Sequence, residues 1–160
     1  MEASLGYVWD GSAWRRRTKR LIPKGWSNDS SIASNGCENY YISADEGEVW
    51  RLENMHLYAP AVSGATSGYH WFRVIQLHSS GLYAVLLSIV SHYNDPVSFH
   101  FMRANQATYG QSPETEVAQI LAIKSALCDS YGNRIWLQYC NFTNAAQTGT
   151  RLYRIMLLSI

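Results

Sequence analysis

The strongest constraint on the fold is a series of short runs in which apolar and polar side chains alternate. Alternation with a period of two places every second side chain on one face, which is typical of a half-buried strand. Turn-forming sequences such as Asp45-Glu46-Gly47, Ser79-Ser80-Gly81 and Asn94-Asp95-Pro96 separate the runs. A run roughly every ten residues, with turns between, is the pattern of a sandwich or barrel. We therefore predict an all-β, antiparallel, jelly-roll-like β-sandwich. The predicted strands are residues 40–43, 49–59, 69–77, 83–91, 97–102, 134–139 and 151–160.

Residues 112–128 carry two patterns at once. Ser112-Pro113-Glu114 is a good helix start, because proline suits the first helical position and an acid suits the first turn. Leu121, Ile123, Ser125 and Leu127 nevertheless alternate as in a strand. We expect a helical turn or short helix that runs into a strand.

The first 26 residues differ from the rest of the chain. They hold three of the six tryptophans, and Trp9 and Trp14 bracket an Asp10-Gly11 pair that favours a tight hairpin. Positions 15–24 contain six basic residues and no acid. We predict an N-terminal arm or anchor hairpin over residues 1–26, a linker over 27–38, and a β-sandwich body over 39–160.

Composition favours a protein that is covered by neighbours. Charged residues make up 16% of the 160, below the roughly 25% of ordinary soluble domains, while aromatics reach 13%. Such a surface is most simply buried in a homo-oligomer or larger assembly. The net charge of +1 argues against nucleic acid as the main partner. No segment is long and apolar enough to span a bilayer, and no signal peptide is visible, so we expect neither a membrane partner nor secretion.

The histidines, cysteines and acidic residues form no recognisable catalytic pattern. The five histidines lack the spacing of a metal site, and the three cysteines lack zinc or thioredoxin spacing. We expect free, buried thiols, with Cys128 and Cys140 a possible pair across a hairpin. Acidic residues sit beside turns and at the proposed helix start, where local structure explains them. We therefore expect no enzyme, no cofactor and no metal.

Sugar binding is a second hypothesis, because exposed aromatic rings beside Asn or Gln can stack on a pyranose. The same rings would equally suit the core or a subunit interface. The candidate glycan platform consists of Tyr69, Trp71, Trp136 and Tyr139.

Two parts of the sequence resemble a known class of protein. The segment Tyr7-Val8-Trp9-Asp10-Gly11-Ser12-Ala13-Trp14 resembles the WDGSAW hairpin found in structural proteins of tailed bacteriophages. ADEGEVWRLENMHL (44–57), ATSGYHWF (65–72) and YCNFTNAAQTGTRLYRIMLLSI (139–160) resemble small phage virion β-sandwich proteins.

This resemblance implies a non-enzymatic virion component that is assembled in the host cytoplasm. It leaves capsid decoration, neck or tail, and fibre or baseplate equally open. Its partners would be other virion proteins, further copies of itself, and in the alternative a host surface glycan; a cell-wall hydrolase is the remaining, disfavoured reading. On this reading deletion of residues 1–26 leaves the body folded and prevents incorporation into particles. The predicted interface residues are Trp9, Trp14, Arg15, Arg16, Arg17, Arg20 and Trp26.

Overall fold

The computed structural model describes residues 7–16, 19–103, 105–108 and 121–160. Two short strands, β1 (Tyr7–Trp9) and β2 (Trp14–Arg16), form a separate hairpin. A four-stranded sheet and a larger sheet make up the body. The four-stranded sheet contains β4 (Gly36–Ile42), β11 (Arg134–Thr143), β6 (Gly68–Leu77) and β7 (Tyr83–His92), in that order. The larger sheet runs β3 (Leu21–Asn28), β12 (Arg151–Ser159), β5 (Val49–Ala59), β8 (Val97–Met102) and β9 (Asn105–Thr108), with β10 (Leu127–Asp129) also paired to β5.

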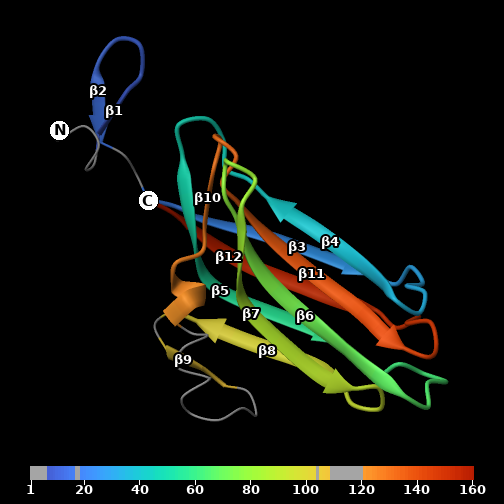
Figure 1. The fold of residues 1–160 in the computed structure, drawn as a ribbon. Helices are drawn as coiled ribbons and strands as arrows, with labels where there is room; N and C mark the ends of the chain where they lie inside the picture. Colours follow the sequence, from blue (N-terminus) through green and yellow to red (C-terminus); the bar gives the residue numbers. More distant parts are fainter. Residues whose placement is uncertain (1–6, 17–18, 104, 109–120) are drawn as a thin grey trace.

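The strand pairing is nested, and it defines the topology. β3 pairs with β12, β4 with β11, β5 with β8, and β6 with β7, all antiparallel. The chain therefore runs as one long hairpin that is rolled up into two facing sheets (Figure 1). This is the jelly-roll arrangement, in which both sheets draw strands from both halves of the chain. The predicted fold class is confirmed.

The core lies between the two sheets. β8 and β12 alternate buried and less buried side chains along their length, as their sequences predict. Phe72, Phe99, Tyr139, Tyr153 and Leu157 are each almost fully buried in it. Burial of side chains of this size stabilises a fold by about 1.5–3 kcal/mol each.

The sequence of residues 49–59 predicts one face made of Trp50, Leu52, His56 and Tyr58 and another made of Val49, Met55 and Leu57. This prediction is wrong in part. Trp50 and Leu52 point into the core, but further along the strand the buried residues are Met55 and Leu57. Met156 lies opposite Asn54 while Leu157 lies opposite Leu52, so β5 carries one extra residue there. A β-bulge of this kind moves the following side chains to the opposite face. His56 consequently lies on the outer face.

The predicted boundary at residue 26 falls inside a strand of the body. β3 pairs with β12 along Leu21–Asn28, and Trp26 stacks on Tyr40 at a ring distance of 4.7 Å. The predicted linker over 27–38 is likewise shortened, because β3 ends at Asn28 and β4 begins at Gly36. The arm and linker boundaries are therefore corrected: the hairpin spans Tyr7–Arg16, and residue 26 belongs to the sandwich.

The ambiguous segment has both characters where the structure describes it. Residues 121–124 are helical, and β10 follows at Leu127–Asp129. The Ser112-Pro113-Glu114 helix start lies outside the described residues. The expected change from helix to strand is present over residues 121–129.

The cysteine prediction is wrong for two of the three residues. Cys37 and Cys140 form a disulfide that joins directly opposite positions of β4 and β11. Cys128 is free and buried, as predicted. Burial raises the pKa of the Cys128 thiol to about 12, so this thiol stays protonated and unreactive at neutral pH.

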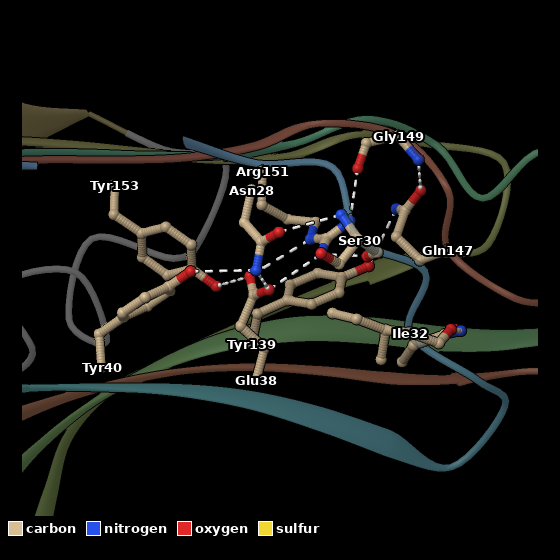
Figure 2. Close-up of polar contacts among 11 residues, drawn as sticks. Asn28, Ser30, Ile32, Glu38, Tyr40, Tyr139, Gln147, Gly149, Arg151 and Tyr153 are labelled. Atoms are coloured by element: carbon tan, nitrogen blue, oxygen red, sulfur yellow. Dashed lines mark hydrogen bonds and ion pairs between the residues drawn. The ribbon is translucent and has the colours of Figure 1, made fainter. Parts of the chain in front are cut away.

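A buried polar network ties the two sheets together at one end of the sandwich (Figure 2). The Arg151 side chain is fully buried, and its Nη2 lies 2.9 Å from Oε2 of Glu38. The same guanidinium donates to the carbonyl oxygens of Ser30 and Gly149, and the Tyr153 hydroxyl donates to Glu38 Oε1. Since Glu38 lies on β4 and Arg151 on β12, this ion pair bridges the two sheets.

His70 is buried in a second chain of hydrogen bonds. Its Nε2 lies 2.7 Å from the carbonyl oxygen of Asp95, which can only accept, so Nε2 carries a proton and donates it. Its Nδ1 lies 2.7 Å from the Tyr139 hydroxyl, which also accepts a hydrogen bond from Gln147 Nε2 at 3.0 Å. Burial lowers the pKa of His70, which favours the neutral ring, and in the neutral ring Nδ1 accepts the hydroxyl proton of Tyr139. We therefore assign His70 a structural role.

Candidate interaction surfaces

The N-terminal hairpin owes its turn to Asp10 and Gly11. Gly11 has a φ of 98°, which suits glycine, and Asp10 Oδ1 accepts from the backbone amides of Ser12 and Ala13. Arg15 Nε lies 2.6 Å from the other carboxylate oxygen. The Arg15 hydrogen bond and the turn amides together hold the Asp10 pKa well below its usual range. The predicted hairpin is therefore present, with its turn stabilised by its own residues.

The two hairpin tryptophans lie together and face solvent. Their ring centroids are 5.6 Å apart in an edge-to-face arrangement, and each residue is 54% exposed. β1 and β2 pair with each other and with no other described strand, and the hairpin stands clear of the sandwich in Figure 1. Trp9 and Trp14 are thus placed as the predicted interface requires.

The other predicted interface residues are placed differently. Trp26 packs on the core, so it is not an exposed anchor. Arg15 pairs with Asp10, and Arg20 pairs with Glu48 at 2.6 Å, which raises the Arg20 pKa. The Arg16 side chain and Arg17 lie outside the described part. Among the basic residues at positions 15–24, Arg15 and Arg20 thus already have partners within the chain.

The outer face of the four-stranded sheet carries a larger aromatic surface. Tyr41 and Trp136 occupy opposite positions on β4 and β11, and their rings stack at 5.5 Å. Trp71 stacks on Phe142 at 4.6 Å, nearly parallel. We call this surface the aromatic face and define it by six rings: Tyr41, Tyr69, Trp71, Tyr83, Trp136 and Phe142. Tyr41, Tyr69, Tyr83 and Phe142 are among the exposed large hydrophobic residues of the chain.

The aromatic face carries positive but no negative side chains. The four strands contain a single acidic residue, Glu38, and its side chain points inward to Arg151. Arg134 lies over the Tyr41 ring at 5.0 Å, and Arg73 lies over Trp71 at 5.2 Å. Aromatic and arginine side chains with few acids are the composition of the centre of a protein interface.

The candidate glycan platform is brought together in part. Tyr69, Trp71 and Trp136 lie on the aromatic face, on β6 and β11. Tyr139 is fully buried in the core, where it contacts His70, so its inclusion in the platform is wrong. Burial raises the pKa of Tyr139 to about 12. Asn39 Oδ1 accepts from Trp136 Nε1 at 2.8 Å and from Gln138 Nε2, so amide groups do lie beside an exposed ring.

Sequence reasoning missed three members of the aromatic face. The predicted strands 40–43 and 83–91 contain Tyr41 and Tyr83 but assign them to no face, and the predicted strand 134–139 ends before Phe142. Period-two alternation from Trp136 through Gln138 and Cys140 to Phe142 was the available signal. It requires β11 to continue to Thr143, beyond the predicted end at residue 139.

The described residues hold no group of three or more His, Cys, Asp or Glu side chains placed to bind a metal ion. Within the same part of the chain, no helix is long and apolar enough to cross a membrane. The histidines are not uniformly scattered, however: His56 and His100 face each other across β5 and β8.

No protein-family model matches this sequence, and no curated protein matches it. Among solved structures, the chain is similar to one from Cocksfoot mottle virus, with a TM-score of 0.44, 13% identity, and coverage of 94% of this chain and 88% of that one. It is also similar to a chain of infectious bursal disease virus strain Gx (TM-score 0.41, 9% identity), covering 96% of this chain and 37% of that one. A chain of the T13 particle of the same virus gives a TM-score of 0.35 at 8% identity, covering 96% and 34%.

Proposed function

We propose that this protein is a non-enzymatic structural component of a virus particle, and that its aromatic face packs against a second copy of the chain. The observation that carries the proposal is the aromatic face itself: six rings and two arginines over four strands, with no acid pointing outward. Large amphipathic rings are costly to leave in water over a continuous area, so such a face is normally covered.

A second copy is the occupant that the charge pattern favours. The face presents both arginines and the rings on which guanidinium groups stack, so two copies related by a twofold axis complement each other. A partner rich in acidic residues would pair with the arginines but would leave the six rings without apolar contacts. The jelly roll is an architecture that virus shells and lectins use, although fold alone does not fix function.

The hairpin supplies a second attachment point in this proposal. Trp9 and Trp14 form an exposed ring pair outside the sandwich, and the segment around them resembles a hairpin of tailed-phage structural proteins. We propose that it docks on a different virion subunit of a tailed bacteriophage. The position could be head, neck, tail or fibre.

Charge placed on the aromatic face is expected to break the homo-oligomer. Val90 lies opposite Trp71 and is 52% exposed, so Val90→Lys adds a further positive charge beside Arg73 without disturbing the core. Met102→Lys is the matched control, since Met102 is 49% exposed on the other sheet. Light scattering after size-exclusion chromatography should give oligomers for the parent and Met102→Lys, and monomers for Val90→Lys.

Deleting residues 1–16 separates the hairpin from the sandwich, because β3 stays intact. The truncated chain should oligomerise normally but fail to enter particles in an infection complementation assay.

A parent protein that is monomeric at micromolar concentration would contradict the role of the aromatic face. Normal incorporation of the truncated chain would contradict the role of the hairpin.

Carbohydrate binding is the second candidate function, and the cluster of Tyr41, Trp136 and Tyr83 favours it. Asn39 and Gln138 lie beside these rings and offer polar groups next to an apolar platform. If this cluster binds a neutral host glycan, Trp136→Ala should remove binding on a glycan array, and Trp9→Ala should not. An array on which the parent binds nothing would exclude this function.

A further inference from the structure

The outer face of the larger sheet carries a row of basic side chains on neighbouring strands. Arg154 of β12 lies opposite His56 of β5, and His56 lies opposite His100 of β8. The two histidine rings are 3.8 Å apart, centroid to centroid. Like charges at directly opposite positions of a sheet destabilise it. Three adjacent basic groups therefore concentrate positive charge on this part of the sheet.

The same row lines a hollow. It measures about 530 Å³, and its lining includes Gly25, His56, His100, Met102, Arg154 and Met156. Gly25 lies opposite Arg154 on the edge strand β3, and its lack of a side chain leaves that side of the guanidinium uncovered. The hollow thus combines this row of basic groups, and Lys24 beside it, with the apolar side chains of two methionines.

The nearby charges do not neutralise this row. No aspartate or glutamate of the described chain lines the hollow. Glu53, on β5, is already paired with Arg51 at 3.2 Å and with Arg103 at 3.4 Å. Lys24, on β3, also lines the hollow and adds a positive charge, with its ammonium 5.5 Å from the centroid of the Trp50 ring. Among the described residues Arg154 forms no ion pair of its own.

We propose that this hollow binds an oxyanion, the phosphate or carboxylate group of a ligand, through Arg154, His56 and His100. A guanidinium and two imidazolium groups on adjacent strands can donate hydrogen bonds to the oxygens of one such group. The methionines would contact the apolar body that carries it. A divalent metal ion fits less well, since the Arg154 charge lies beside the two imidazoles. This inference is independent of the proposed assembly function, because it concerns the opposite sheet.

Affinity should rise as the pH falls. Burial and the neighbouring His100 and Arg154 lower the pKa of His56, so the free protein carries a largely neutral imidazole at neutral pH. A bound anion favours the protonated imidazole and so raises that pKa. By linkage, the anion binds more tightly at a pH where His56 is already protonated.

Histidine NMR on the full chain tests this site, with inorganic phosphate and glucuronate as separate probes at about pH 5.5 and pH 8. We expect a saturable shift of the His56 and His100 ring signals with at least one probe, stronger at the lower pH. Losing one charge-assisted hydrogen bond should make binding about tenfold weaker or more in Arg154→Gln. Arg73→Gln, on the aromatic face, should bind as the parent does.

The two probes distinguish the source of the oxyanion. A shift with phosphate alone identifies a phosphoryl ligand, and a shift with glucuronate alone identifies a carboxylate such as an acidic sugar. Absence of a saturable shift with both probes would overturn the proposal, as would an unchanged affinity in Arg154→Gln. Since these residues lie on the outer face, circular dichroism should show that each variant is folded.

Discussion

Replacing Arg151 with methionine is expected to lower the free energy of unfolding by about 3–5 kcal/mol. The substitution introduces an apolar side chain of similar length, and it leaves the Glu38 carboxylate, which is 9% exposed, without its cation. It also leaves the carbonyl oxygens of Ser30 and Gly149 without a donor. A buried charge that loses its partner retains its desolvation cost, and this makes the effect large.

Urea denaturation measures this difference, with Arg154→Met as the control. Arg154 is three residues further along the same strand and points to solvent, so its replacement should change stability by about 0.5 kcal/mol or less. The double variant Arg151→Met/Glu38→Leu removes both charges and should recover part of the loss. A cost below about 1 kcal/mol for Arg151→Met would show that this pair does not hold the two sheets together.

Reducing the Cys37–Cys140 bond is expected to cost about 2–5 kcal/mol of unfolding free energy. The bond closes a loop between residues 103 positions apart, and a long loop restricts the unfolded chain more than a short one. The native sheet itself should persist, because β4 and β11 are paired over seven residue positions, Gly36 to Ile42. The measurement is the urea midpoint of the parent with and without reductant.

Cys37→Ala supplies the control for this second prediction. The Cys37 residue is exposed, so alanine there leaves no core cavity, and stability should become indifferent to reductant. Cys128 should not exchange into the bond, because its thiol is buried and its pKa is raised. Equal midpoints for the parent under both conditions would mean that the bond contributes nothing in solution.

Much of the fold can be predicted from the local sequence pattern. Val49–Ala59 and Val97–Met102 have the predicted ends, since each is a run of alternating side chains bounded by turn residues. The predicted terminal strand is present as β12, and one of its two alternating faces, which includes Tyr153, Ile155 and Leu157, is buried. These features depend on residues that are close together in the sequence, so one sequence is enough to predict them.

The errors come from contacts between distant residues. A bulge in β5 depends on how β12 pairs with it, so the alternation of residues 49–59 could not show the change of face. Cys37 and Cys140 meet because β4 and β11 are paired, and their spacing in sequence carries no sign of it. The sequence assigns Trp26 to the arm because it follows a run of basic residues. Its stacking on Tyr40 depends on the pairing of β3 with the sandwich, which the local sequence does not show. Of the candidate site, the strand positions of Tyr69, Trp71 and Trp136 were predictable, whereas the burial of Tyr139 was not.

The position of β12 constrains how the protein is made. It lies between β3 and β5. The pairing of Asn28 with Arg151 and that of Tyr58 with Leu152 can therefore form only after β12 has been synthesised. A ribosome that has synthesised most of this chain therefore holds an unfinished sheet with open strand edges, which tend to associate with other chains. The larger sheet should close only after β12 has been synthesised, and a premature stop codon anywhere before β12 should yield aggregates in place of a shortened domain.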